Sequence, residues 1–376
     1  MAAAVSAARA GAEAVLLEAR PRLGGTVAHC LIHTIGGLFD DAGERINPGL
    51  ASELIGRLID AGAAHGKRKL GRAWVLDVCP AAYQAVTECW LTAEPRVVVR
   101  TGTAIHGVWT TGDRLDAVDA ADGDRIEADA VIDCTGTAEV VRQVDPALLR
   151  DEPERAAGGL IFRVRGVDPA VREFPRSIQA VRALQRAGED GGLHRTCAKA
   201  WIDRGIHADE VFVKLMVPVP SDWRAREVLG GITAEARGVQ TAVLDFLQRL
   251  PGYSAAQVTT VGELGIRDGG RVHGDYCLTA DDVRRARKFA DAACRAGWPI
   301  EYWDPEQGVK MEYLPAGSYY QVPLRSLRVR GFANLWVAGK CLSADRLAQA
   351  SARVVGTCWA MGEAAGRAAA AAMRTP

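Results

Sequence analysis

The sequence predicts an α/β fold: a three-layer domain with a parallel sheet, assembled from both ends of the chain, and an α+β domain inserted between them. The first observation lies at the N-terminus, where the Ala-rich segment 2–10 contains no helix breaker and Gly11 provides a turn. Residues 14–17 then form an apolar strand that ends at Glu18. A helix, a turn and a strand ending in an acid are typical of a Rossmann-like nucleotide-binding unit, in which the acid holds the ribose hydroxyls.

The second observation is a complementary pattern near the C-terminus. A buried-type strand over 334–338 runs into Gly339, and a long helix of small residues follows at 356–372. Because nucleotide-binding features occur at both ends, we expect the nucleotide domain to be discontinuous and the middle of the chain to form a substrate domain. The expected boundaries are 1–150 with 261–376 for the first domain and 151–260 for the second.

The remaining elements follow from periodicity and turn signals along the chain. Apolar residues at helical spacing predict helices at 50–64, 83–91, 177–187, 234–250 and 281–296. Apolar or alternating runs bounded by turn signals predict strands at 96–100, 107–118, 124–128, 130–134, 159–165, 211–219 and 319–325. The helix at 281–296 opens with a capping signal, because Thr279 precedes Asp282 by three residues.

The bulk composition narrows the class of protein. The chain has 376 residues and a formal net charge of +0, so no global field favours binding to nucleic acid or to an anionic membrane. No uncharged apolar run reaches about 18 residues, so we expect no transmembrane helix. The nine cysteines are scattered and form no C-x-x-C pair, which favours reduced thiols in a cytoplasmic protein over a disulfide framework or a metal site.

A glycine-rich phosphate loop is the element that the N-terminal pattern lacks. In a Rossmann unit this loop lies about 20 residues before the acid, so its last glycine would fall just before Met1. The strand before the loop would be missing as well, which predicts a gap in the parallel sheet. We expect the natural start to lie upstream, with Met1 an internal methionine; the alternative is a degenerate protein.

Five stretches of the chain carry a resemblance to one family of enzymes. They are 7–26, 129–136, 265–279, 319–327 and 334–366. In this order they resemble the FAD-dependent oxidoreductases with the glutathione-reductase type of nucleotide fold, and most closely the branch related to the fumarate reductase flavoproteins. The resemblance implies FAD as the cofactor and a small molecule as the substrate.

The resemblance also implies a set of cofactor-binding residues. The family places the backbone of the loop glycines and of the strand-end turns against the flavin, while Glu18 suits the ribose. Arginine suits the pyrophosphate, the flavin or the substrate, because its rigid guanidinium fork pairs with phosphate or carboxylate. The full set is Glu18, Gly24, Gly25, Thr26, Thr135, Gly136, Arg267, Gly339 and Arg353.

The catalytic candidates are polar side chains in the stretches that the family places near the flavin ring. His29 and His33 follow the Gly-Gly loop, and histidine can move a proton at neutral pH. Tyr320 is expected on the substrate face, with Arg325 as a further cation. Related flavoproteins sometimes attach FAD covalently through a histidine of this region, so covalent and non-covalent attachment both stay open. No metal ligand set is predicted.

The leading functional hypothesis is an FAD-dependent dehydrogenase or oxidase, in which flavin N5 exchanges a hydride with a small-molecule substrate. An NAD-linked dehydrogenase is a second hypothesis, since Glu18 suits either cofactor, and a cofactor-free binding or assembly protein is a third. Flavin hydroxylases match less well, because the segment after Gly339 lacks their Gly-Asp element. No motif in 151–260 specifies the substrate, and a homo-oligomer stays open.

Overall fold

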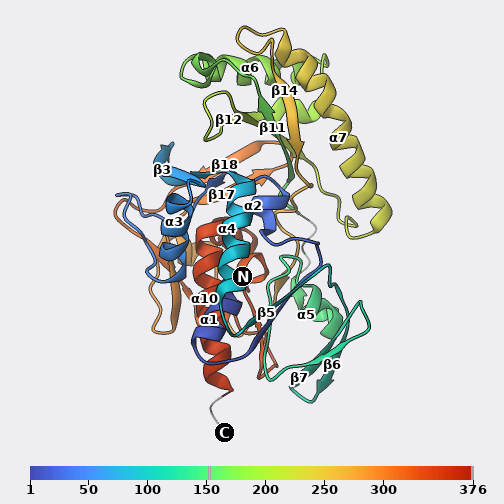
Figure 1. Cartoon of the computed structure of the whole chain (residues 1–376), viewed down its shortest axis with the longest axis vertical. Coiled ribbons are helices and arrows are strands. Elements are labelled where there is room, and N and C mark those ends of the chain that lie inside the picture. Colours follow the sequence, from blue (N-terminus) through green and yellow to red (C-terminus); the bar gives the residue numbers. More distant parts are fainter. Residues whose placement is uncertain (151, 153, 374–376) are drawn as a thin grey trace.

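The structure is a computed structural model, and it describes residues 1–150, 152 and 154–373. The predicted domain boundary at residue 151 lies outside the described residues. Figure 1 shows an elongated molecule whose lower part combines the beginning of the chain, in blue to teal, with its end, in orange to red. The green and yellow middle of the chain forms the upper part. The mixed α/β fold class that the sequence predicts is confirmed.

The two ends of the chain pack against each other through small residues. Helix α1 (Ala2–Arg9) lies along α10 (Val355–Ala372). A Cβ atom added to Gly366 would lie 2.3 Å from the carbonyl oxygen of Ala3, so only glycine allows the two backbones to approach this closely. The C-terminal helix therefore returns to the N-terminal segment of the chain.

Two pairs of parallel strands contain the nucleotide-binding pattern. Strand β1 (Ala14–Glu18) pairs with β5 (Val97–Thr101), and β9 (Val131–Asp133) pairs with β20 (Leu335–Val337). The second pair joins the N-terminal and C-terminal segments of the chain. Among the strands of the described residues, none joins the two pairs into one sheet.

Antiparallel strands and short helices surround these pairs. One sheet has the order β2-β4-β3, and another has the order β6-β7-β8 and includes the predicted hairpins. The strands are β2 (Thr34–Ile35), β3 (Ala64–Leu70), β4 (Ala73–Val78), β6 (Ile105–Thr111), β7 (Arg114–Ala120) and β8 (Arg125–Glu127). The helices are α2 (Gly25–His29), α3 (Leu50–Asp60), α4 (Pro80–Ala93) and α5 (Glu139–Val144).

The upper part of the molecule is a four-stranded antiparallel sheet covered by helices (Figure 1). Its strand order is β12 (Trp201–Arg204), β13 (Val211–Val217), β11 (Gly158–Arg165) and β14 (Gln257–Val261). The helices are α6 (Arg176–Glu189) and α7 (Arg226–Gln248), and a 3₁₀ turn, η2 (Pro169–Arg172), precedes α6. Helix α7 buries Ala236, Val239, Val243 and Leu247, which recur every three or four residues and so form one apolar face.

This upper part has a hydrophobic core of its own. Its buried cluster is drawn from residues 160–256 and includes Phe162, Leu184 and Val243. The largest cluster of the lower part is drawn instead from both ends of the chain, from Ala2 to Ala369.

The predicted helix at 281–296 is wrong beyond its first turn. Helix α8 (Ala280–Arg284) begins with the expected capping box, in which the Thr279 and Asp282 side chains and backbone N–H groups pair reciprocally. The chain then leaves the helix and forms β16 (Ala292–Ala296), which pairs with β19 (Tyr320–Pro323). Pairing with a distant strand overrides the local helical pattern here.

Short elements complete the lower part. The strands are β10 (Leu149–Arg150), β15 (Arg271–Val272), β17 (Ile300–Asp304) and β18 (Gly308–Glu312), and helix α9 spans Arg346–Ala352. Four more 3₁₀ turns are η1 (Pro146–Leu148), η3 (Arg195–Lys199), η4 (Leu324–Ser326) and η5 (Gly339–Cys341). Among the described residues, every helix is too short or too polar to span a bilayer.

Candidate functional site

Three cationic side chains from separate segments gather in the lower part: Arg267, Lys340 and Arg353, called here the cation cluster. Each of these residues keeps some exposed surface, but protein surrounds its charged group. The resulting loss of solvent is the largest cause of the lowered pKa of all three side chains. Repulsion from Arg353 adds to the effect on the other two, and the pKa of Arg267 falls to about 9. Loss of solvent and like charge both disfavour the cationic form.

Neutral groups rather than acids hold the cation cluster in place. Lys340 Nζ donates to the carbonyl oxygen of Ile266 at 2.7 Å, and Arg353 donates to that of Glu301 at 3.2 Å. The Nε atom of Arg353 is buried and has no partner among the described residues. The Arg267 guanidinium lies 4.0 Å from the ring centre of Trp303. The cluster therefore carries positive charge that the described part of the chain leaves without an ion pair.

Two acids, Glu301 and Asp268, attract the cluster without pairing with it. Glu301 opposes the lowering of the pKa of both Arg267 and Arg353. Its carboxylate, however, accepts hydrogen bonds from the indole nitrogens of Trp298, at 2.9 Å, and Trp303, at 3.0 Å. These two indoles orient the carboxylate, so the positive excess of the cluster is reduced but not removed.

Two predicted glycines lie directly beside the cation cluster. Gly136 has a φ of +74°, and a Cβ atom there would lie 2.8 Å from Lys340 Cε. Gly339, with a φ of +77°, immediately precedes Lys340. Only glycine adopts these backbone angles at low cost.

The predicted Gly24-Gly25 loop reaches the same region. Both glycines have positive φ, at +113° and +52°; Gly24 directly precedes α2, and Gly25 and Thr26 are its first two residues. Cys30 is the residue directly after this helix. Burial raises the pKa of its thiol, and the positive charges of Lys340 and Arg267 oppose this rise. Lys340 therefore lies beside Gly136, directly follows Gly339, and acts on the thiol that ends the segment begun by the loop.

Glu18 and Thr135 lie at the carboxyl ends of the parallel strands. The Glu18 carboxylate accepts the N–H of Arg20 at 3.0 Å. Burial lowers the pKa of the Met1 α-amino group, and the charges of Cys134 and Glu18, at the two strand ends, oppose this fall. The Thr135 side chain is engaged locally, because its hydroxyl donates to Asp133 at 2.7 Å and accepts the N–H of Glu139.

The four predicted catalytic side chains do not form one group. His33 is buried, stacks on Phe212 with 3.8 Å between ring centres, and has its pKa lowered to about 3 by desolvation and then by Lys214. His29 is half-buried, with Nε2 at 3.1 Å from the carbonyl oxygen of Arg22. Their roles stay predictions.

The other two catalytic candidates are engaged with neighbours of their own. Tyr320 is buried, and its hydroxyl pairs with that of Ser351 at 2.8 Å. Arg325 lies at the surface and pairs with Asp291 at 2.9 Å. Lys340 is the residue that sequence reasoning missed; its signal was its place directly after Gly339 at the end of a buried strand. No set of His, Cys, Asp and Glu side chains in the described part of the chain is arranged to hold a metal ion.

Several solved structures resemble the chain at low identity. The Diels-Alderase PyrE3 of pyrroindomycin biosynthesis is 18% identical, with a TM-score of 0.39 over 73% of this chain, and the match spans 54% of PyrE3. A geranylgeranyl bacteriochlorophyll reductase-like protein from Thermoplasma acidophilum is 12% identical, with a TM-score of 0.45 over 98% of this chain and 74% of the other. The probable FAD-dependent monooxygenase pqsL from Pseudomonas aeruginosa is 14% identical, with a TM-score of 0.41 over 99% and 82%.

A comparison with curated proteins gave no match. A family model described as FAD dependent oxidoreductase, in contrast, matches residues 1–376, which is the whole chain. This match does not favour the NAD-linked and cofactor-free alternatives. The chain therefore belongs to the FAD dependent oxidoreductase family, and it is an enzyme whose cofactor is FAD.

Proposed function

We propose that this enzyme transfers a hydride between a small-molecule substrate and flavin N5, and that the cation cluster holds an anionic part of FAD. The observation that carries the proposal is the unpaired positive charge of Arg267, Lys340 and Arg353 beside Gly136 and Gly339. Burying a charge without a partner is costly. A bound anion at this locus would offset that cost, so these residues fit the cofactor.

The domain division belongs to the same proposal. We assign FAD to a discontinuous domain of residues 1–150 and 261–376, and substrate selection to residues 151–260. The separate hydrophobic cores support this division, because the core of the upper part draws only on the middle of the chain. A domain with its own core can be varied without disturbing the cofactor site.

The chemistry requires an electron acceptor and a proton carrier. FAD, when bound, supplies the electron acceptor by taking a hydride from the substrate. We assign the proton to His29, because it lies on the helix that follows the glycine loop and keeps exposed surface. The Nε2 atom of His29 contacts the carbonyl oxygen of Arg22, which can only accept a hydrogen bond, so Nε2 must be the donor. The other ring nitrogen, Nδ1, is then free to accept the proton.

A titration of the cofactor-free protein with FAD tests the binding site. Lys340→Met and Arg353→Met should each weaken FAD binding by about 10–100-fold, since a charge-assisted contact contributes about 1.5–3 kcal/mol. Arg367→Met is the control, because Arg367 lies exposed on α10 beside Glu363. Unchanged FAD affinity in both cluster variants would refute the assignment. Denaturing the loaded protein shows whether FAD is attached covalently.

The reaction needs a separate test. Candidate small molecules are screened for bleaching of the flavin band near roughly 450 nm, the property of reduced flavin. With a substrate in hand, deuterium at the carbon that gives up the hydride should slow the bleaching. His29→Gln should slow it by about 10²–10⁴-fold, the usual contribution of a proton-transferring side chain. Absence of any isotope effect on bleaching in single-turnover measurements would argue against hydride transfer.

A further inference from the structure

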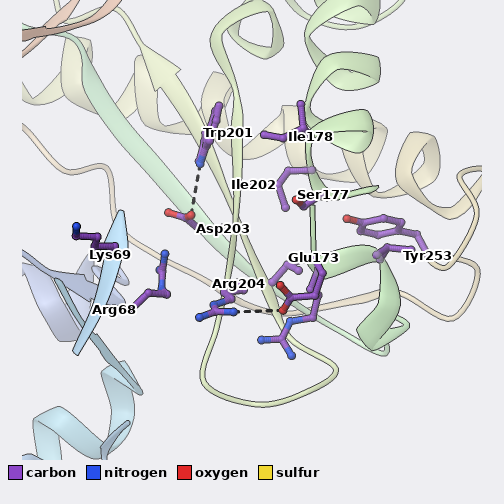
Figure 2. A pocket seen from close by; sticks show the side chains of 13 residues that line it. Arg68, Lys69, Glu173, Ser177, Ile178, Trp201, Ile202, Asp203, Arg204 and Tyr253 are labelled. Carbon is purple, nitrogen blue, oxygen red and sulfur yellow. Dashed lines mark hydrogen bonds and ion pairs between the residues drawn. The ribbon is translucent and has the colours of Figure 1, made fainter. Parts of the chain in front are cut away.

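A cleft lies between β3 of the lower part and the segments η2, α6 and β12 of the upper part. It measures about 460 Å³ and adjoins a second hollow of about 500 Å³, with Arg68, Arg172, Glu173 and Arg204 lining both. In Figure 2, Arg68 and Lys69 project from β3 on one side, and Arg204 comes from the strands on the other. Cavities of this size suit small organic ligands.

Arg172 brings a positive charge to this cleft without an ion pair to any described carboxylate. Its terminal nitrogens donate to the backbone carbonyl oxygens of Gly205, at 2.7 Å, and of Ala208. Its Nε atom is buried and has no partner in the described part of the chain. Desolvation, followed by repulsion from Arg204, lowers its pKa. Neutral groups fix this guanidinium, and an anion beside it would counteract both effects.

The acids that line the cleft are already matched by other cations. Glu173 lies 3.2 Å from Arg204, and Asp203 lies 2.6 Å from the Lys214 ammonium. Burial alone would raise the pKa of Asp203, but the attraction of Lys214 outweighs it, and the pKa falls to about 2. With these acids matched, Arg172 remains as the cleft cation that can serve a ligand.

The wall opposite β3 offers apolar and aromatic surface. Trp201 is 38% exposed although it lines a concave site, and Ile178 and Ile202 lie near it in Figure 2. Tyr253 closes the far end of this wall. Aromatic side chains contribute most to binding when a flat partner covers them. The cleft thus combines unmatched positive charge with an uncovered indole.

We propose that this cleft binds a small organic anion: a carboxylate carried on a flat apolar ring system, with the carboxylate at Arg172 and the ring against Trp201. Neither residue belongs to the set assigned to FAD, so the site stands independently of the proposed hydride transfer. Guanidinium and ammonium groups pair strongly with carboxylates, and the indole supplies the surface that an inorganic anion would leave uncovered.

Isothermal titration calorimetry on the FAD-loaded protein tests the site with three probes. 2-Naphthoate has both the charge and the ring, 2-naphthamide has only the ring, and inorganic phosphate has only the charge. We expect 2-naphthoate to bind at least about 10-fold more tightly than either of the others. Equal affinity for the carboxylate and the amide overturns the proposal, as does the absence of naphthoate binding at millimolar concentration. Phosphate binding as tight as naphthoate binding overturns the organic class.

Substitutions locate the site. Arg172→Met should weaken 2-naphthoate binding by about 10–100-fold and leave 2-naphthamide binding unchanged. Because Arg172 also holds the backbone at Gly205 and Ala208, Trp201→Leu is the second variant. It should weaken the binding of both 2-naphthoate and 2-naphthamide, since the exposed indole would contact the ring of each. Naphthoate binding at wild-type affinity in both variants overturns the proposal.

A control variant and a second readout keep this test separate from that of the FAD site. Arg182→Met removes an exposed cation of α6 that does not line the cleft, and it should bind 2-naphthoate as the wild type does. The flavin absorbance of each sample is recorded before titration. A variant that keeps its FAD and loses naphthoate binding has lost the cleft alone, whereas loss of FAD in Lys340→Met concerns the cation cluster.

Discussion

Two of the regions in which protein surrounds charged side chains differ in the way they balance the charge. The first is the ionic network under the cleft, which consists of Arg68, Asp77, Asp203 and Lys214. Asp77 lies 2.6 Å from Arg68, and this pair connects β4 to β3 in the lower part. Asp203 lies 2.6 Å from Lys214, and this pair connects β12 to β13 in the upper part. Each charged group of the network is therefore paired with another group of the network.

The second region is the cation cluster, where three like charges gather and no described acid pairs with them. Neutral carbonyl oxygens fix these cations, and desolvation lowers the pKa of each one. Such an arrangement costs stability unless a ligand supplies the missing charge. The comparison teaches that balanced buried charges serve the fold, whereas unbalanced ones indicate a ligand site. Substitutions in the two regions should therefore change stability with opposite sign.

The largest effect is expected from Asp203→Asn. This change leaves the Lys214 ammonium, 19% exposed, without its counter-charge, and breaking one side of a buried pair costs about 3–5 kcal/mol. Urea unfolding of the FAD-free protein measures the loss. Glu312→Gln is the control, because its pair with Arg284 is largely exposed and such pairs contribute about 0–1 kcal/mol. Equal small losses in both variants would mean that the network does not hold the fold.

The next effect is a pH dependence that arises from His33, which packs against the network. Its pKa is about 3 in the folded protein and 6.5 when unfolded, so between these values the unfolded chain binds more protons. Stability should therefore be full above pH 6.5 and should fall as the pH decreases toward 3, by up to roughly 4 kcal/mol. Unfolding free energies at pH 4, 5, 6 and 7 give the slope. His33→Leu should flatten it, and an identical slope in both proteins would show that His33 titrates normally.

The opposite sign is expected in the cation cluster. Lys340→Met removes one of three mutually repelling charges, so the FAD-free protein should gain about 1 kcal/mol, in keeping with the favourable replacement of poorly compensated buried charges. The same variant should lose FAD affinity. Thermal unfolding with and without FAD measures both changes: the melting temperature should rise without FAD, and the additional rise on adding FAD should shrink. A lower melting temperature without FAD would remove the contrast between the regions.

The elements that the sequence predicted well are those that local pattern determines. Strands β1 and β9 are short apolar runs that end at an acid, β20 is an apolar run that Ala338 and Gly339 follow, and α10 consists mainly of small residues. The helix predicted at 281–296 failed because β16 exists only through its pairing with β19, some 25 residues further along the chain. Local spacing contains no information about such a partner.

Some residues of the candidate site could likewise be predicted from local sequence, whereas others depend on tertiary contacts. Gly136, Gly339, Arg267 and Arg353 were predicted from motifs, and all four lie at or beside the cation cluster. The cleft could not be predicted, because it forms only where β3 meets segments more than 100 residues away. Nor could the sequence distinguish paired from unpaired arginines, since the partner of each cation is set by tertiary contacts.

The smallest effect is expected from Arg325→Met, and it tests how far the rule of balanced charges extends. Arg325 is 52% exposed at its side chain and pairs with Asp291 at 2.9 Å, so its loss should cost about 0–1 kcal/mol. Because this charge is matched, FAD affinity should change less than in Lys340→Met. Parallel FAD titrations of the two variants measure the difference. A loss of FAD affinity in Arg325→Met as large as in Lys340→Met would show that a paired surface cation can also serve the cofactor, and pairing would then no longer separate structural cations from functional ones.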